Sequence, residues 1–377
     1  MKIVHIADTH LGRAGFNKTT EDGSNLRETL IYNNFIASIE KIIQLKPDVV
    51  IHAGDLFDAV HPKTKAYTTI LTALDLLEES CIPLIAIAGN HSMQKTMYNI
   101  SPFTVIERYK NLYPAYSFKY ELAEIGNTHL HLIPNMLHAE DYHNTYKKIQ
   151  INPNYNNILV THGLATTIQD RKLSTVAEFE LDENILTDKF DYIALGHYHG
   201  QMQVMPNAWY SGSIEYLTYG EIGDVKGGLV FDTDKHTVSH LDLPHIPMVD
   251  LGIINCTNLT TKEIQDRIWD SMGGKSKDSH DMMQVTLDFE NTSVRQLPPD
   301  FLEYISEDLL DLKIRIKSKE TSQPQIQHQN LNTIDYIKEF SNFVQQQPIN
   351  ELQKPIIEKC GSETLKTVMM NHLDVTE

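Results

Sequence analysis

The chain has few cysteines, no long apolar run and a shortage of positive charge. Cys81, Cys256 and Cys360 are scattered and odd in number, which argues against a disulfide framework and predicts a reducing, cytoplasmic location. No apolar run approaches the roughly 18 residues that cross a bilayer. The first residues read as a strand rather than a secretory leader. We therefore expect no association with a membrane.

Acidic residues outnumber basic ones by 50 to 32, which gives a formal net charge of −18. A protein that binds DNA unaided is usually basic, because phosphate neutralisation supplies most of the non-specific affinity. If this chain acts on DNA, its positive charge has to come from bound metal ions and a basic partner. The alternative is a small or non-nucleic substrate, with the acidity serving solubility.

Five short motifs rich in Asp, Asn and His each follow an apolar, β-branched run. The runs are Ile3–Ile6, Val49–Ile51, Leu84–Ile87, Ile158–Val160 and Tyr192–Leu195. The motifs that follow them are Asp8-Thr-His10, Gly54-Asp55-Leu-Phe-Asp58, Gly89-Asn90-His91, Thr161-His162-Gly163 and Gly196-His197-Tyr-His199. Apolar runs that end at polar residues predict buried strands that deliver side chains to one sheet edge. Oxygen and nitrogen ligands without cysteine favour a dinuclear centre of ions such as Mn²⁺ over a structural zinc.

The spacing within the motifs suggests how the ligands are shared. Side chains at i and i+2 of an extended segment point the same way. Asp8 with His10, and His197 with His199, are therefore each expected to reach one small site. The carboxylate of Asp55 has two oxygens and can bridge cations about 3.5–4 Å apart, a separation that suits phosphoester chemistry.

These motifs resemble the pattern of calcineurin-type metallophosphoesterases, D-x-H, G-D-x-x-D, G-N-H-[D/E], H and G-H-x-H. The resemblance implies one metal held by Asp8, His10, Asp55 and His199, and a second held by Asp55, Asn90, His162 and His197. It leaves His91 outside both ligand sets, as the proton donor to the leaving oxygen. Ser92 stands where the family usually has an acid that orients the neighbouring histidine, so the orientation of His91 stays open.

Three further stretches are similar to SbcD and the meiotic-recombination-eleven family of DNA double-strand-break repair nucleases. They are the opening residues 1–12, the motif at residues 54–58 followed by Pro62, and Trp209–Glu215. The likeness spans residues 1–232 and implies a DNA exonuclease and endonuclease with two Mn²⁺ ions. It also implies a homodimer and an SMC-like coiled-coil ATPase partner of the SbcC type. The alternatives are a small-molecule phosphodiesterase or phosphoprotein phosphatase on the same fold, and a scaffold whose catalysis is weakened by Ser92.

Strand and helix signals alternate along the chain and predict an α/β fold, a two-sheet β-sandwich flanked by helices, over residues 1–243. A small α+β unit follows at 244–318 and looks like the family's capping domain, which clamps DNA. Residues 319–332 are polar and Gln-rich and predict a flexible linker. A helical tail at 333–377 is predicted to bind the partner, or alternatively to pack on its own chain. Its apolar residues at helical spacing include Ile334, Ile337, Phe340 and Val344.

Several other residues carry expectations of their own. Arg13 and Asn17 lie in the loop after His10, from which they could reach a phosphate or simply face solvent. Asp58 is assigned either to capping its loop or to contacting substrate. His5 and His52 lie inside predicted strands, so we expect them to be core residues or to support the metal ligands.

Overall fold

The computed structural model describes residues 1–93, 100–165, 181, 184–273, 280–289, 301, 305–306, 309–317, 340–341, 343–345 and 353–373. The strands are β1 (Lys2–Ile6), β2 (Val49–His52), β3 (Leu84–Ile87), β4 (Leu112–Ala115), β5 (Glu121–Ile125), β6 (Thr128–Ile133), β7 (Asn156–His162), β8 (Tyr192–Gly196), β9 (Met202–Met205), β10 (Ala208–Tyr210), β11 (Gly228–Asp232), β12 (Thr237–Leu241), β13 (Met248–Asn255), β14 (Met282–Asp288) and β15 (Asp311–Lys317). The helices are α1 (Leu26–Gln44), α2 (Thr64–Glu79), α3 (Phe103–Ile106), α4 (Ala139–Tyr146), α5 (Thr261–Ser271) and α7 (Lys354–Leu373), and a 3-10 turn, η2, covers Tyr219–Glu221. Among these residues no helix is both long and apolar enough to cross a membrane.

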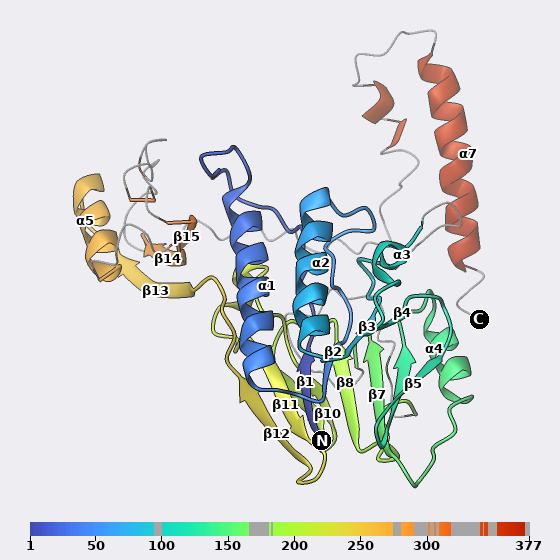
Figure 1. The fold of residues 1–377 in the computed structure, drawn as a ribbon. Helices are drawn as coiled ribbons and strands as arrows, with labels where there is room; N and C mark the ends of the chain where they lie inside the picture. The colour runs from blue at the N-terminus through green and yellow to red at the C-terminus, as the bar shows by residue number, and fades with distance from the viewer. Residues whose placement is uncertain are drawn as a thin grey trace. The chain divides into compact units, whose positions relative to one another are not determined.

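Two six-stranded sheets carry the fold (Figure 1). The first has the order β12-β11-β1-β2-β3-β4 and the second the order β5-β6-β7-β8-β10-β9. All five apolar runs that precede the motifs form strands, namely β1, β2, β3, β7 and β8. The predicted two-sheet sandwich with flanking helices is confirmed.

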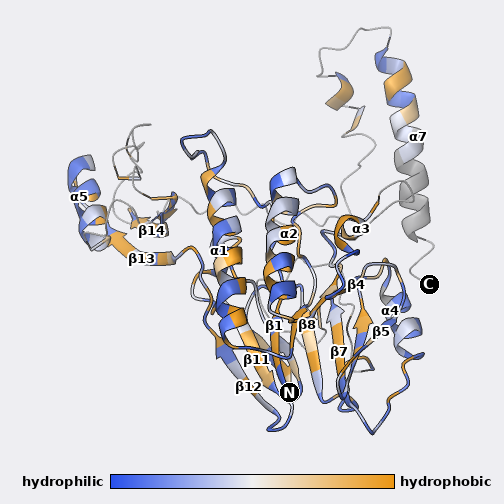
Figure 2. Ribbon diagram, viewed as in Figure 1, coloured by the Kyte–Doolittle hydropathy of each residue, from blue (hydrophilic) through white to orange (hydrophobic). Residues whose placement is uncertain are grey.

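Alternation of side chains along the strands builds the layers. In β1, Ile3 belongs to the core between the two sheets, whereas Val4 and Ile6 belong to the core beneath α1 and α2. In β8, Tyr192 points toward the inter-sheet core and Ile193 toward the core on the outer face of the second sheet. Strands buried on both faces are mostly apolar. Figure 2 accordingly shows β8 and β11 as hydrophobic, while α1 and α2 carry hydrophilic stretches.

Helix α1 begins after an N-cap residue, Asn25. The Asn25 side chain accepts a hydrogen bond from the backbone N–H of Glu28 at 3.0 Å, which satisfies one of the free donors of the first turn. Ile31, Phe35, Ile39 and other apolar residues recur on one face of α1 and are buried against the first sheet. This packing fixes the loop before α1, which follows the motif at residues 8–10.

The third sheet, of order β13-β14-β15, lies beyond the sandwich along the chain and carries α5. Thr260 and Glu263 form a capping box at the start of α5. Met248 and Met282 join the hydrophobic cluster that contains the buried face of α1. Residues Met1–Asp288 and Arg295–Ile316 form one compact unit, and Phe289–Val294 with Lys317–Glu377 form another. The domain boundaries at residues 243, 318 and 332 stay predictions.

The tail is described in part. Ile334 and Ile337 lie outside the described residues. Val344 is buried, and a Cβ added at Gly361 of α7 would lie 2.2 Å from the Phe340 ring, so this ring packs directly on α7. Among the described residues of this region, Phe343, Ile356 and Ile357 are exposed apolar side chains.

His5 and His52 are buried within β1 and β2, as the sequence led us to expect. His5 Nδ1 lies 2.9 Å from the Tyr192 hydroxyl, and His52 Nε2 lies 2.9 Å from Thr9 Oγ1. Burial lowers the pKa of each histidine from 6.5 to about 3. Both are therefore neutral in the folded protein at pH 5, where the unfolded chain protonates them.

At these two histidines the unfolded state binds more protons than the folded state below pH 6.5, so their contribution to the free energy of unfolding should fall as the pH drops from about 6.5 to 3. Each histidine contributes up to about 1.4 kcal/mol per pH unit. Urea unfolding of the chelator-treated protein at pH 7, 6 and 5 measures this slope. His5→Gln should reduce the slope by about one proton. Equal slopes for wild type and His5→Gln would contradict the assignment.

Candidate metal centre

The carboxyl ends of strands from both sheets deliver the predicted ligands to one place. Ile6 of β1 lies opposite His52 of β2, so the two strands end together. Beyond them, backbone N–H groups of Asp8 and His10 donate to the carbonyls of Gly54 and Asp55, each at 3.0 Å. In the second sheet, His162 of β7 lies opposite Gly196 of β8. These registers align the loops before any side chain is considered.

Among the described residues, ligand atoms gather in three groups, each with its atoms within 4.8 Å of one another. The groups are Asp8, His10 and His199; Asp55, His162 and His197; and His10, Asp55 and His91. The first holds three of the four residues in one ligand set implied by the family resemblance, and Asp55 adjoins it through His10 in the third group. The second holds three residues of the other set, and its fourth, Asn90, has Oδ1 3.0 Å from both His162 Nε2 and His197 Nδ1. The third shows that His91 lies beside both sets.

The structure places Asp8 and His10 in one group, whereas His197 and His199 fall in different groups, as the family resemblance implies and the i and i+2 spacing does not. Neither pair is extended, because Asp8, His10 and His197 have φ values of 52°, 45° and 101°. Such left-handed conformations are costly for residues other than glycine and concentrate at functional sites. The turn at His197 sends the two side chains of its motif to different places.

Three of the histidines are held in the same way through Nδ1. His10 Nδ1 lies 3.1 Å from Asp58 Oδ1, and His199 Nδ1 lies 3.1 Å from Glu221 Oε1. His162 Nδ1 lies 2.9 Å from the Ala53 carbonyl. Carboxylate and carbonyl oxygens only accept, so each Nδ1 carries the proton and donates it. The lone pair of each neutral ring is then on Nε2, the atom left for a metal.

The Nε2 atom of His162 faces a carboxylate oxygen and that of His10 lacks a partner, which is the arrangement that a cation satisfies. His162 Nε2 lies 3.4 Å from Asp55 Oδ2. His10 Nε2 is buried, 3.9 Å from the same oxygen, and has no hydrogen-bond partner among the described residues. A lone pair directed at a carboxylate is repulsive unless positive charge lies between them. The residues present therefore fit a centre of divalent cations.

The pKa of His162 also indicates that positive charge is needed between His162 and Asp55. Burial alone would lower it, but the Asp55 and Asp8 carboxylates outweigh burial and raise the pKa of His162 to about 9. In the absence of metal a proton therefore supplies the positive charge between His162 and Asp55. A metal ion that binds there has to displace that proton.

Glycines give the ligands room. A Cβ added at Gly89 would lie 2.2 Å from Asp55 Oδ1 and 2.5 Å from the Asp55 backbone nitrogen. Gly54 has a φ of 106°, and a Cβ there would lie 2.1 Å from His162 Nδ1. Both positions therefore need glycine for steric reasons, and Gly54 for conformational ones as well.

Asp58 holds two histidines at once. Its carboxylate accepts from His10, and its backbone carbonyl lies 2.9 Å from His91 Nδ1. Arg13 Nη1 lies 3.5 Å from the same carboxylate, and Asn17 is exposed. Substrate contact by Arg13, Asn17 or Asp58 stays a prediction.

Ser92 does not take the place of the missing acid. Its side chain is buried, and Ser92 Oγ has no hydrogen-bond partner among the described residues. The Asp58 carbonyl accepts the Nδ1 proton of His91 instead. The orientation of His91 is therefore set by the loop after β2.

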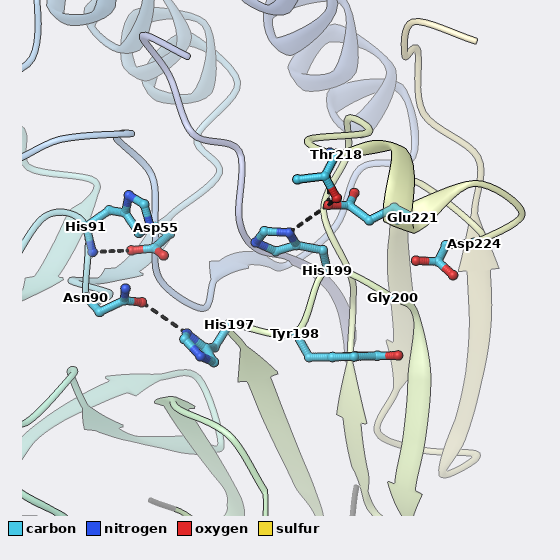
Figure 3. Close-up of a pocket in the computed structure, with 11 residues that line it drawn as sticks. Asp55, Asn90, His91, His197, Tyr198, His199, Gly200, Thr218, Glu221 and Asp224 are labelled. Atoms are coloured by element: carbon cyan, nitrogen blue, oxygen red, sulfur yellow. Dashed lines mark hydrogen bonds and ion pairs between the residues drawn. The ribbon is translucent and has the colours of Figure 1, made fainter. Parts of the chain in front are cut away.

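Sequence reasoning missed Glu221 and Lys226. Both follow the last motif by more than twenty residues, yet Glu221 lines the same pocket of about 400 Å³ as Asp55 and His199 (Figure 3). A usable signal was present, because Thr218-x-x-Glu221 has the spacing of a capping box, and the structure shows both halves of that box. The pattern locates a turn but does not say what the carboxylate contacts.

Comparison with known proteins agrees with the site. The model of the calcineurin-like phosphoesterase family matches residues 1–201. The chain is 31% identical over 282 residues to the DNA double-strand break repair protein Mre11 of Methanocaldococcus jannaschii, covering 71% of this chain and 70% of that protein. It is 29% identical over 266 residues to the protein of the same description from Methanococcus maripaludis, covering 64% of this chain and 67% of that protein. The chain therefore belongs to the calcineurin-like phosphoesterases and, among them, to the Mre11 family. The resemblance inferred from the motifs is confirmed, and with it the class of metal-dependent hydrolase.

Proposed function

We propose that this chain is the Mn²⁺-dependent DNA exonuclease and endonuclease subunit of an SbcCD-like complex that repairs double-strand breaks. One observation carries the proposal: two groups of nitrogen and oxygen ligands converge around Asp55, in a chain whose relatives are double-strand break repair proteins. An all-nitrogen-and-oxygen donor set without cysteine suits Mn²⁺. Its substrate would be the DNA phosphodiester bond.

The proposed mechanism uses two metal ions. Asp8, His10, Asp55 and His199 would hold one, and Asp55, Asn90, His162 and His197 the other. When bound, such ions lower the pKa of a coordinated water and neutralise charge on phosphate oxygens. The chain's own contribution is orientation, since the Nδ1 contacts of His10, His162 and His199 fix where each Nε2 points.

His91 would protonate the leaving 3′ oxygen. Its side chain lines the pocket and is 37% exposed, so a substrate can reach it. Because Nδ1 donates to the Asp58 carbonyl, the proton available for transfer is the one on Nε2 of the charged ring. The backbone N–H of His91 also donates to Asp55 Oδ1 at 2.9 Å, which ties the acid to the shared ligand.

The acidic composition is consistent with an assembly rather than an isolated DNA binder. We infer a homodimer that associates with an SMC-like coiled-coil ATPase of the SbcC type, which would provide most of the contact with DNA. The exposed Phe343, Ile356 and Ile357 at the tail suit an apolar groove on that partner. A cytoplasmic location fits this role and stays a prediction.

Asp55→Ala should remove both ions and abolish cleavage, because Asp55 is the shared ligand. Mn²⁺ content and cleavage of linear duplex DNA are measured together, with Asp188→Ala, an exposed aspartate, as control. Nuclease activity that survives Asp55→Ala would refute the site. Wild-type protein that cleaves bis(4-nitrophenyl) phosphate but no DNA would instead favour the small-molecule phosphodiesterase.

His91→Ser should slow DNA cleavage by about 10²–10⁴-fold, the usual cost of losing a general acid. Its Mn²⁺ content should stay at the wild-type level, since neither ligand set implied by the family requires His91. His61→Ser, at an exposed histidine, serves as the matched control. Loss of one ion in His91→Ser would make this residue a ligand and not an acid.

Removal of residues 333–377 should leave Mn²⁺-dependent cleavage of short DNA nearly unchanged and abolish co-purification with the ATPase. Phe343→Asp with Ile356→Asp should have the same effect, because burying a charge in an apolar groove is costly. Sedimentation velocity gives the oligomeric state of each form, with a dimer expected. Truncated protein that aggregates, or that retains the ATPase, would show that the tail packs on its own chain.

A further inference from the structure

Glu221 contacts a metal-ligand histidine and a buried lysine through different oxygens. Oε1 accepts from His199 Nδ1 at 3.1 Å, and Oε2 accepts from Lys226 Nζ at 2.7 Å. The backbone N–H groups of Leu217 and Thr218 also donate to this carboxylate, at 3.0 and 3.2 Å. The Glu221 side chain is 9% exposed. Its position is therefore fixed from several directions.

Lys226 secures the other side of this arrangement. Its side chain is completely buried, and Nζ donates to Glu221, to Ser213 Oγ at 2.9 Å and to the His199 carbonyl at 3.0 Å. All three ammonium protons are thus used. Lys226 therefore binds the backbone of the same histidine whose ring Glu221 binds.

The set of partners requires a carboxylate at position 221. His199 Nδ1–H, Lys226 Nζ and two backbone N–H groups are all donors, so the side chain has to accept on both of its outer atoms. Glutamine offers one acceptor and one donor, and its amide nitrogen would face a donor in either orientation. A carboxylate behind a ligand imidazole also makes that ligand more basic.

We propose that Glu221, held by Lys226, is a positioning residue that orients His199 and strengthens its bond to the metal it shares with Asp8 and His10. Figure 3 shows the Glu221 carboxylate and the His199 ring joined along the wall of the pocket. The inference rests on the metal centre of the proposed function and adds a residue outside the five motifs. It does not depend on the identity of the phosphoester.

Glu221→Gln should bind Mn²⁺ at one of the two sites about 10–100-fold more weakly, the usual effect of removing such a supporting carboxylate. Titration followed by the electron paramagnetic resonance signal of free Mn²⁺ gives both affinities in the full-length chain. Asp224→Asn is the matched control, because Asp224 lines the same pocket and its substitution removes the same negative charge as Glu221→Gln. Its affinities should stay within about threefold of wild type, a margin well below the expected loss.

Glu221 could also serve only as the partner of Lys226 in a structural ion pair. Melting temperatures of the variants measured in chelator separate this structural role from the support of the metal ligand. Glu221→Gln leaves Lys226 buried without its carboxylate, so the metal-free protein can lose stability. The double variant Glu221→Gln with Lys226→Met removes both charges and should recover the melting temperature but not the Mn²⁺ affinity. The proposal would be overturned if the double variant recovered both the melting temperature and the Mn²⁺ affinity. Wild-type Mn²⁺ affinity in Glu221→Gln would also overturn it. Asp55→Ala tests the metal centre independently.

Discussion

The carboxylate of Asp55 is the contact on which the two halves of the site depend. It follows β2 in the first sheet, yet Oδ2 lies 3.4 Å from Nε2 of His162 at the end of β7 in the second sheet. Oδ1 accepts from the His91 backbone after β3. Three loops from two sheets thus meet at one side chain. Their lone pairs and negative charge are compatible only if positive charge lies among them.

The surrounding contacts keep this arrangement from relaxing. Asp58 and Glu221 fix His10 and His199 through Nδ1, and the Ala53 carbonyl fixes His162. The turn that carries Glu221 is also attached to the third sheet, because the Tyr219 hydroxyl donates to Asp311 of β15 at 2.7 Å. The site is therefore supported by backbone registers, by the groups that hold His10, His162 and His199, and by a strand outside the sandwich.

Much of this could be predicted from the sequence because it depends on local patterns. Burial requires apolar residues in β1, β2, β3, β7 and β8, so the apolar runs of the sequence locate these strands. The polar residues after each run are the candidate ligands. The N-cap at Asn25 likewise depends on local side-chain chemistry, because its side chain accepts from the Glu28 N–H three residues later. Strand ends and helix caps depend on a few neighbouring residues, so they can be predicted from one amino-acid sequence.

What could not be predicted depends on contacts between distant residues or on unusual backbone. The left-handed turn at His197 separates that residue from His199, and no spacing rule for extended chains anticipates it. The Asp58 carbonyl, rather than Ser92, accepts the Nδ1 proton of His91. Glu221 and Lys226 reach His199 from beyond β10, through a turn whose partner the sequence does not name.

Anomalous scattering from crystals grown with Mn²⁺ would locate the metal ions directly. Two peaks are expected within bonding distance of Asp55, one also beside Asp8, His10 and His199 and the other beside Asn90, His162 and His197. The separation should be about 3.5–4 Å, as in other two-metal sites. A single peak, or two peaks that do not share Asp55, would contradict the assignment of Asp55 as the shared ligand.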